Sequence, residues 1–476
     1  MKKSFFLLIA VFLASFVSAQ EKPHIIFVMA DDQGWGQTSY NGHPRIKTPN
    51  LDAMAANGLR FDRFYAGASN CSPSRATVLT GRTNDRTGVE THGFPIRLQE
   101  KTIAHALSEA GYATGHFGKW HLNGLRGPGV PVLASDTHHP GAFGFQHWLT
   151  VTNFFDMNPL LGRMGEIEEY KGDSSEVVMK QALKFIKKKS KSQPTFTVVW
   201  YGTPHDPMVA SEEDRAPFAD LPEEHQHQYG EISALDRSIG ALREGLQEMG
   251  IADNTLVWYC SDNGGLEKFG PETMGGLRGA KNTMYEGGLR VPGIIEWPGR
   301  IKNGRITDFP AGTVDMFPTI AEIVGLPDDS RIQPQDGMSL VPVIDRKKEK
   351  RGSYLPFRHT DRGVLTGDRY KIISQKGKYE LYDLKADQNE NTNLIDSKPE
   401  VAKELIAQYE AWAATVDASI AGKDYPEGKV DPNQPERRFW YEDEAYAPHF
   451  STFLGRPEYQ KYDKILKGET KGPSGK

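Results

Sequence analysis

Two features of the sequence predict an α/β fold built around a large, mainly parallel sheet. Short apolar, β-branched or aromatic runs alternate with longer segments of helical periodicity, which is typical of βαβ units. Polar residues follow directly after several of these runs, as they do at the ligand-binding edge of such sheets. The expected strands are residues 25–30, 113–117, 196–201, 255–260 and 291–297.

The expected helices carry ordinary start and stop signals. Thr48-Pro49 opens a helix that Gly58 closes, because proline suits the first helical turn and glycine suits a helix end. His225 and His227 precede the longest helical pattern, and we expect them to be solvated. The helical segments are residues 48–58, 102–111, 174–190 and 229–249.

The first residues of the chain predict a cleaved export signal, residues 1–19. Lys2 and Lys3 precede an apolar run at residues 5–16, and the small residue Ala19 stands before the expected cleavage site. The run is shorter than the roughly 20 apolar residues that span a membrane, so we expect no stable membrane insertion. The mature protein is therefore expected to be periplasmic or secreted.

Charge and cysteine content exclude two other classes of protein. The 476 residues carry a formal net charge of −5, so no overall basic surface favours nucleic acid as a partner. Cys71 and Cys260 are the only cysteines, which excludes a disulfide framework. Cys260 ends an apolar run and is expected to be a buried thiol. Cys71 lies in a polar segment, residues 69–75, where packing does not explain it.

The composition changes after about residue 345 and predicts a smaller C-terminal α+β subdomain. We expect a catalytic α/β domain at residues 20–345 and this subdomain, with a small antiparallel sheet and a helix, at residues 346–476. The chain from about residue 432 is expected to wrap the surface and fray at its end. The expected elements of the subdomain are strands near residues 370–374 and 380–384 and a helix at residues 400–419.

Carboxylates, an amide, an amine and imidazoles directly follow the expected strands. Because the carboxyl ends of parallel strands meet at one edge of a sheet, we expect these side chains to converge there. They are Asp31, Asp32, Lys119, His121, His205, Asp262 and Asn263.

Asp31-Asp32 and Asp262-Asn263 predict a metal site at that edge. Hard oxygen ligands from two loops suit Ca²⁺ or Mg²⁺ better than zinc, and adjacent carboxylates repel unless a cation lies between them. Each pair alone is more often a turn, but two pairs at matching strand ends favour a metal.

Positively charged residues complete the candidate site. Arg75, Lys119 and Lys281, with His121 and His205, supply the charge and the proton donors that an anionic tetrahedral transition state requires. Taken singly, a histidine such as His205 is more often structural, and a lysine such as Lys281 is more often an exposed loop residue.

The segment Cys71-Ser72-Pro73-Ser74-Arg75, followed by Thr80-Gly81, resembles the C-x-P-x-R…T-G signature of type I sulfatases of the alkaline phosphatase superfamily. The resemblance implies an alkaline-phosphatase-like fold, with a large, mainly parallel mixed sheet sandwiched by helices. Further segments in the family's order extend it over most of the mature chain: Asp31-Asp32, residues 48–52, 118–121, 204–205 and 261–264, Lys281 and residues 382–384.

The resemblance further implies how the nucleophile is made. A separate enzyme, formylglycine-generating or anaerobic sulfatase-maturating, would read Pro73 and Arg75 and oxidise Cys71 to Cα-formylglycine. One hydroxyl of the hydrated aldehyde would attack sulfur and the other would later expel sulfate. By the same resemblance, Ca²⁺ (with Mg²⁺ an alternative) would be held by Asp31, Asp32, Asp262 and Asn263 and would touch the modified Cys71.

The other roles that the resemblance implies fall on five residues. Arg75 would position the nucleophile, and Lys119 and Lys281 would bind the sulfate oxygens. His205 would protonate the leaving alcohol, and His121 would take the proton when the intermediate collapses. A further polar group on the sulfate is expected between residues 135 and 153, with no single candidate.

The resemblance leaves the substrate open. Export favours a sulfated carbohydrate, with algal polysaccharides as the first expectation and glycosaminoglycans as an alternative. Trp120, Trp148, Phe154 and Phe155 could stack on sugar rings or belong to the core. Phosphonate monoester and phosphodiester hydrolases can share the cysteine signature, so they remain a second class. An inactive sulfated-glycan-binding protein is a third, disfavoured because every named site residue is present.

Overall fold

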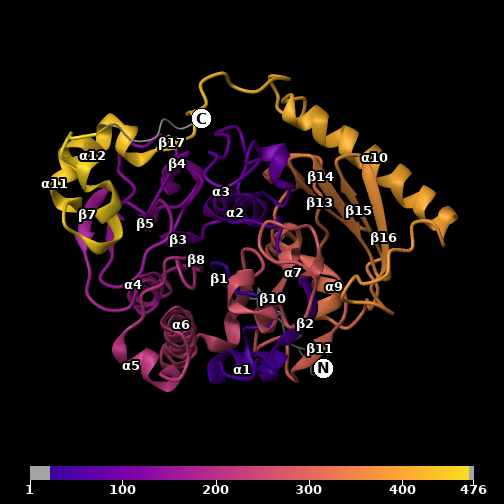
Figure 1. Ribbon diagram of the computed structural model, residues 1–476, viewed down its shortest axis with the longest axis horizontal. Coiled ribbons are helices and arrows are strands. Elements are labelled where there is room, and N and C mark those ends of the chain that lie inside the picture. The colour runs from indigo at the N-terminus through magenta and orange to yellow at the C-terminus, as the bar shows by residue number, and fades with distance from the viewer. Residues whose placement is uncertain (1–21, 471–476) are drawn as a thin grey trace, which may run out of the picture.

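The computed structural model describes residues 22–470, so the expected export signal at residues 1–19 lies outside the described part (Figure 1). Within those described residues, no helix combines the length and apolar character needed to cross a membrane.

A mixed sheet of eleven strands runs through the middle of the molecule (Figure 1). Its order is β11-β2-β10-β9-β1-β8-β3-β5-β6-β7, and β12 pairs with β2. The five central strands from β9 to β5 are all parallel, so the expected mainly parallel sheet is confirmed. They are β9 (Thr255–Ser261), β1 (His24–Ala30), β8 (Thr195–Trp200), β3 (Ala113–Lys119) and β5 (His147–Val151).

Antiparallel pairings occur toward both edges of the sheet. The strand expected at residues 291–297 exists as β10, but it pairs antiparallel with both β9 and β2, and β6 and β7 form an antiparallel extension at the other edge. The outer strands are β11 (Arg305–Thr307), β12 (Ala311–Gly312), β2 (Leu59–Tyr65), β10 (Arg290–Glu296), β6 (Leu160–Arg163) and β7 (Glu166–Glu169).

Helices cover both faces of the sheet because the central strands are apolar on both faces. In β1, Phe27 and its alternate neighbours join one core cluster, while Val28 and its neighbours join the cluster on the opposite face. One face is covered by α1 (Pro49–Asn57), α4 (Ser174–Lys189) and α6 (Glu223–Glu248), and the other by α2 (Cys71–Thr80), α3 (Ile103–Glu109) and α8 (Met316–Val324). The short helices are α5 (Glu212–Arg215), α7 (Glu286–Leu289) and α9 (Val341–Ile344).

Helix α6 starts earlier than the sequence pattern indicates, so His225 and His227 lie within the helix and pack against neighbouring residues. His225 packs edge-on against the rings of Tyr229 and Phe269. His227 Nδ1 accepts a hydrogen bond from the backbone N–H of Ala210 at 3.0 Å. Both side chains are half-buried, so the expectation that they are solvated was wrong.

The smaller C-terminal unit contains an antiparallel sheet, as expected, covered by the long helix at the right of Figure 1. The sequence predicted its last two strands and its helix. The first two strands were missed, because Arg, His and Gly interrupt their short apolar runs. The elements are β13 (Leu355–His359), β14 (Arg362–Thr366), β15 (Tyr370–Gln375), β16 (Lys378–Asp383) and α10 (Pro399–Ile420).

The tail, residues 421–470, leaves α10, passes across the top of Figure 1 and ends at the opposite side of the molecule beside β5 and β7. The part beyond residue 432 is more than a surface wrap, because it builds an aromatic cluster around Trp440, which is fully buried. The last residues, where fraying was expected, lie outside the described part. The elements of the tail are β17 (Arg438–Phe439), which pairs with β4 (Leu125–Arg126), and the helices α11 (Phe450–Phe453) and α12 (Asp463–Leu466).

Candidate active site

Cys71 is the first residue of α2, a helix that the sequence analysis missed because its residues are mostly small and polar. The side chain of Cys71 is 2% exposed, and every residue of α2 is buried. Gly81 ends the helix in the left-handed conformation, with φ at 69°, and its N–H donates to the carbonyl of Thr77. The motif from Cys71 to Gly81 therefore spans one helix that fixes the orientation of Cys71.

Two neighbouring strands bring the expected oxygen ligands together. Asp31 and Asp32 follow β1, and Asp262 and Asn263 follow the adjacent β9. The backbone N–H of Asp32 donates to Oδ1 of Asp262 at 3.1 Å, and Nδ2 of Asn263 donates to Oδ1 of Asp32 at 2.7 Å. All four side chains are fully buried.

Each of the three buried carboxylates has a basic partner. Lys119 Nζ lies 2.5 Å from Oδ2 of Asp31, and Lys281 Nζ lies 2.7 Å from Oδ2 of Asp32. Arg75 Nη2 lies 2.7 Å from Oδ2 of Asp262 and 3.8 Å from Oδ2 of Asp31. The charges of the bases and the carboxylates therefore offset one another in a largely buried region.

The pKa values of two carboxylates respond in opposite ways to this crowding. Burial would raise the pKa of Asp32, but Lys281 and His205 outweigh it and lower the pKa to about 2. Burial and the negative charge of Asp31 raise the pKa of Asp262 to about 7. A group of acids that repel one another in this way is stabilised by a bound cation.

Two histidines, each expected after a strand, lie at the same edge of the sheet. His205 Nε2 is 3.8 Å from Oδ2 of Asp32, and its Nδ1 donates to the carbonyl of Asp206. Burial and the charge of Lys281 lower the pKa of His205 to about 3. His121 is buried, with φ at 55°, and neither ring nitrogen has a hydrogen-bond partner among the described residues.

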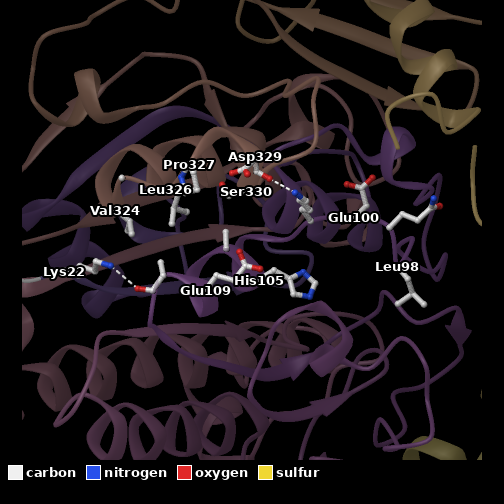
Figure 2. Close-up of a pocket in the computed structure, with 15 residues that line it drawn as sticks. Lys22, Leu98, Glu100, His105, Glu109, Val324, Leu326, Pro327, Asp329 and Ser330 are labelled. Carbon is white, nitrogen blue, oxygen red and sulfur yellow. Dashed lines mark hydrogen bonds between the residues drawn. The ribbon is translucent and has the colours of Figure 1, made fainter. Parts of the chain in front are cut away.

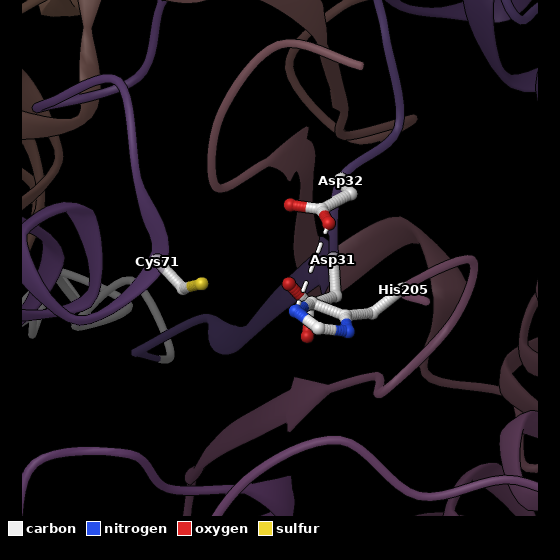
Figure 3. A group of neighbouring side chains, drawn as sticks. All are labelled: Asp31, Asp32, Cys71 and His205. Carbon is white, nitrogen blue, oxygen red and sulfur yellow. Dashed lines mark ion pairs between the residues drawn. The ribbon is translucent and has the colours of Figure 1, made fainter. Parts of the chain in front are cut away.

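The oxygen atoms at this edge fit a metal ion. Oδ1 of Asp31 and Oδ1 of Asn263 are buried and lack hydrogen-bond partners within residues 22–470. Figure 3 shows the sulfur of Cys71 pointing toward Asp31, Asp32 and His205, and the potential ligand atoms of these four residues lie within 4.8 Å of one another. Carboxylate and amide oxygens are donors that Ca²⁺ and Mg²⁺ prefer.

A pocket of about 310 Å³ opens above these residues. Of the four aromatic residues considered for sugar stacking, Trp120, Trp148 and Phe155 belong to the core, and only Phe154 lines the pocket. The lining residues are Asn70, Cys71, His92, His121, Arg126, Gly127, Pro128, Asn153, Phe154, His205, Lys281, Asn282, Phe439 and Lys461.

Asn153, at the end of the range in which a further polar group was expected, lines the pocket, whereas several other lining residues were not anticipated from the sequence. Asn153 is 8% exposed, donates from Nδ2 to the carbonyl of Gly127, and has no partner for its Oδ1 among the described residues. It follows β5 by two residues, so the rule that found Asp31 would have found it had β5 been predicted. No motif marks Phe439 or Lys461, which come from the distant tail.

A second hollow, of about 450 Å³, lies between α3 and the end of α8 (Figure 2). Lys22 Nζ donates to the carbonyl of Ala110 there, and Lys101 Nζ donates to the carbonyl of Asp329. None of the expected site residues lines this hollow. The structure instead brings all ten of them to the edge of the large sheet: Asp31, Asp32, Cys71, Arg75, Lys119, His121, His205, Asp262, Asn263 and Lys281.

A buried nucleophile candidate among carboxylates and bases, at the edge of a mainly parallel sheet, is typical of enzymes that hydrolyse anionic esters. The Sulfatase family model matches residues 23–326, and the model of the N-sulphoglucosamine sulphohydrolase C-terminal region matches residues 279–414. The chain belongs to the sulfatase family, the type I sulfatases of the alkaline phosphatase superfamily, whose members are sulfuric ester hydrolases. The family expected from the cysteine motif is thereby confirmed.

Individual relatives and solved structures agree with this assignment. N-acetylgalactosamine-6-sulfatase from Homo sapiens is 33% identical over 362 residues, which cover 68% of this chain and 66% of that protein. Arylsulfatase A from Bos taurus is 30% identical over 482 residues, covering 86% of this chain and 91% of that protein. The chain thus spans about two thirds of the first relative and most of the second.

Among solved structures, Ps i-CgsB in complex with k-i-k-neocarrahexaose has a TM-score of 0.74 at 22% identity, and the match covers 94% of this chain and 100% of that chain. Phosphonate monoester hydrolase of Agrobacterium radiobacter has a TM-score of 0.62 at 21% identity, covering 83% and 96%. These likenesses confirm the alkaline-phosphatase-like fold.

Proposed function

We propose that this protein hydrolyses sulfate esters on a carbohydrate, with Cys71 oxidised to Cα-formylglycine as its nucleophile. The observation that carries the proposal is the position of Cys71, at the start of α2 and facing Asp31 and Asp32. Burial raises the pKa of the Cys71 thiol to about 11, although Lys119 and Lys281 oppose this. An unmodified Cys71 would thus stay a protonated thiol, which is a poor nucleophile.

The proposed cofactor is Ca²⁺, with Mg²⁺ as the alternative. Asp31, Asp32, Asp262 and Asn263 would hold the ion, together with the modified Cys71. The bound ion would supply Lewis-acid neutralisation of the charge on the sulfate. The unpartnered oxygens of Asp31 and Asn263 support this assignment, because buried acceptors without donors are costly.

The remaining charged residues would bind the sulfate and move protons. Lys119 and Lys281 would bind sulfate oxygens, and Arg75 would brace residue 71 from the buried side. The hydrogen bond from His205 Nδ1 to the carbonyl of Asp206 fixes the ring with Nε2 3.8 Å from Oδ2 of Asp32. His205 would give a proton to the leaving alcohol from Nε2 once the ring is doubly protonated, a form that the negative charge of the bound sulfate would favour. His121, whose nitrogens have no partner among the described residues, would accept the proton released when the covalent intermediate collapses.

The proposed substrate is a sulfated polysaccharide or its oligosaccharides. An algal sulfated polysaccharide is favoured by the similarity to Ps i-CgsB, which was crystallised with a neocarrahexaose, over 94% of this chain. A glycosaminoglycan is the alternative, which the identity to human N-acetylgalactosamine-6-sulfatase favours. Sulfate release from carrageenan oligosaccharides, measured beside chondroitin sulfate oligosaccharides, separates the two.

We also propose that the protein is exported and that Cys71 is modified by a separate enzyme. Cleavage after Ala19 would yield a periplasmic or secreted protein that begins at Gln20, and N-terminal sequencing of the mature protein tests this. A formylglycine-generating or anaerobic sulfatase-maturating enzyme would act on Cys71.

Peptide mass spectrometry across Cys71, on protein from a host that matures sulfatases, is the direct test of the nucleophile. We expect a loss of about 18 Da, because an aldehyde oxygen replaces the thiol sulfur and two hydrogens. Sulfate release from the glycan panel should accompany it. An intact cysteine without sulfate release would favour the inactive glycan-binding protein, and faster turnover of aryl phosphonate than of aryl sulfate would favour the phosphonate hydrolase.

A further inference from the structure

The tail forms one wall of the catalytic pocket, through Phe439 and Lys461. Strand β17 pairs with β4 in a register that sets Phe439 opposite Arg126. The guanidinium of Arg126 lies 4.6 Å from the centre of the Phe439 ring. Arg126 also lines the pocket, so these two residues form one surface with an aromatic face and a cationic edge.

This wall is fixed in place by the aromatic cluster of the tail. Trp440, next to Phe439, is fully buried. Tyr446 Oη donates to the carbonyl of Pro131 at 2.9 Å, and Tyr459 Oη donates to the carbonyl of Gly129 at 2.6 Å. The loop that follows Arg126 and the tail therefore behave as one packed unit. The two matched family models end at residues 326 and 414, so Phe439 and Lys461 lie outside the matched regions.

The positive charges at this wall lack carboxylate partners. No Asp or Glu is among the described residues that line the pocket. Arg126, Arg437 and Lys461 instead lie against the rings of Phe439, Phe94 and Tyr462, respectively, and Arg437 also donates to the carbonyl of His92 at 3.4 Å. Lys119, Lys281 and Arg75, deeper in the site, each have a carboxylate within 4.0 Å.

The pKa of the neighbouring His92 is lowered by burial and also by this excess of positive charge. Burial, followed by the charges of Arg437 and Arg126, lowers the pKa of His92 to about 4, so the imidazole is neutral at physiological pH. An uncompensated positive region in a chain of net charge −5 calls for an anionic ligand.

We infer that Arg126 and Lys461 bind a second anionic group of the substrate, while the ring of Phe439 stacks on one face of a sugar ring. This inference rests on the proposed sulfatase function and narrows its substrate to glycans with another sulfate or a carboxylate beside the sulfate that is removed. The scissile sulfate already has its own bases in Lys119 and Lys281. Arg126 and Lys461 are therefore available to a neighbouring charge.

The test compares sulfate release from matched saccharides by the matured enzyme. The substrates are monosulfated galactose and N-acetylgalactosamine, their disulfated counterparts, and monosulfated disaccharides with either a uronic acid or a neutral sugar as neighbour. We expect kcat/KM to be about tenfold higher for the substrate with the second anion, as charge-assisted hydrogen bonds of this kind provide. The disulfated and uronate arms distinguish a sulfate from a carboxylate as the second group.

The double variant Arg126→Gln, Lys461→Gln should reduce that preference to about twofold or less, and added salt should reduce it in the wild type. Lys464→Gln, an exposed lysine of the same tail that does not line the pocket, is the matched control and should keep the preference. Equal kcat/KM for singly and doubly charged substrates in the wild type would overturn the inference. So would an equal loss of preference in Lys464→Gln.

The failure of the proposed function has a different signature. In that case neither aryl sulfate nor any saccharide releases sulfate, and residue 71 remains cysteine. Binding of the disulfated and monosulfated sugars to Cys71→Ala, measured by calorimetry, gives a second reading of the preference that needs no turnover. Equal affinities for the two sugars would overturn the inference as well.

Discussion

Phe154 lies flat against the imidazole of His205, with the ring centres 4.8 Å apart and the planes 7° from parallel. Both rings line the pocket, and they come from different strands, since Phe154 follows β5 and His205 follows β8. The stack covers one face of the proposed proton donor and limits its rotation. The orientation of His205 therefore depends on a residue outside the sulfatase motifs.

Phe154→Ala should slow the enzyme most where protonation of the leaving group matters. We expect kcat to fall about tenfold on a glycan sulfate, whose alcohol is a poor leaving group. The loss should be small on nitrophenyl sulfate, whose phenol leaves without help. The control is Phe154→Leu, which keeps apolar cover without the flat contact. Its kcat on the glycan sulfate should lie between those of the wild type and Phe154→Ala. Equal losses on both substrates would show that the stack does not act through His205.

Arg75 should be needed for folding as well as for the chemistry. It is fully buried, contacts Asp262 and Asp31, and lies 5.0 Å from the centre of the Trp200 ring. Arg75→Met should lower the free energy of unfolding by about 3–5 kcal/mol, because it leaves the buried carboxylate of Asp262 without its base. Denaturant unfolding of the variant measures this loss.

A second substitution separates the charge effect from lost packing. Asp262→Asn in the Arg75→Met background should recover part of the stability, because it removes the unpaired charge. Arg45→Met, which breaks the exposed pair with Asp220, should change stability little. If Arg75→Met and Arg45→Met behave alike, the buried pair does not stabilise the fold.

Removal of calcium should destabilise the protein and stop turnover. A ligand present at a hundred times its Kd stabilises the folded state by about 2.7 kcal/mol, so EGTA should lower Tm by several degrees and added Ca²⁺ should restore it. Asp32→Asn should weaken this response, because it removes a charge from the proposed ion site, whereas the exposed Asp253→Asn should not. Identical melting curves with EGTA and with Ca²⁺ would exclude Ca²⁺ as the stabilising ion.

The sequence predicted the central sheet and the site because both depend on local patterns. The apolar runs that became β1 and β9 are continuous, and the polar pairs after them needed only the parallel topology to meet. Helix α2 was not predicted, because Ser72, Pro73 and Ser74 have low helix propensity and tertiary burial determines their conformation.

Contacts between distant segments limited the rest of the prediction. Phe439 reaches the pocket through a two-residue strand that pairs with β4, more than 300 residues earlier. Such short strands have no hydrophobic periodicity, so the sequence does not indicate which strand they pair with. The antiparallel pairing of β10 was missed for a related reason, since the same apolar run suits a parallel and an antiparallel neighbouring strand.

A pair of buried carboxyl groups lies behind the loop that carries His205. Glu231, on α6, is fully buried and accepts the backbone N–H of Val209 at 2.7 Å, while Oε2 of Glu231 and Oδ1 of the half-buried Asp156 have no hydrogen-bond partner among the described residues. Burial raises the pKa of both carboxyls, and their mutual repulsion adds to this for Glu231. The folded protein therefore retains a proton on this pair at a pH where the unfolded chain has released it.

This pair should make the protein less stable as pH rises above about 4, the value of an unperturbed carboxyl. The folded state binds more protons than the unfolded state in that range, so the free energy of unfolding falls with pH until the pair titrates. Glu231→Gln keeps an acceptor for Val209 but removes the acid. It should flatten the dependence of Tm on pH and raise Tm at pH 8 by about 2 °C.

Thermal unfolding between pH 5 and 8, at saturating Ca²⁺, measures this effect without interference from metal loss. Glu244→Gln, an exposed glutamate on the same helix, is the control and should follow the wild-type curve. If the Glu231→Gln and wild-type curves run parallel, the pair releases its proton at an ordinary pH. In that case the stability of the loop with His205 would not depend on a shared proton.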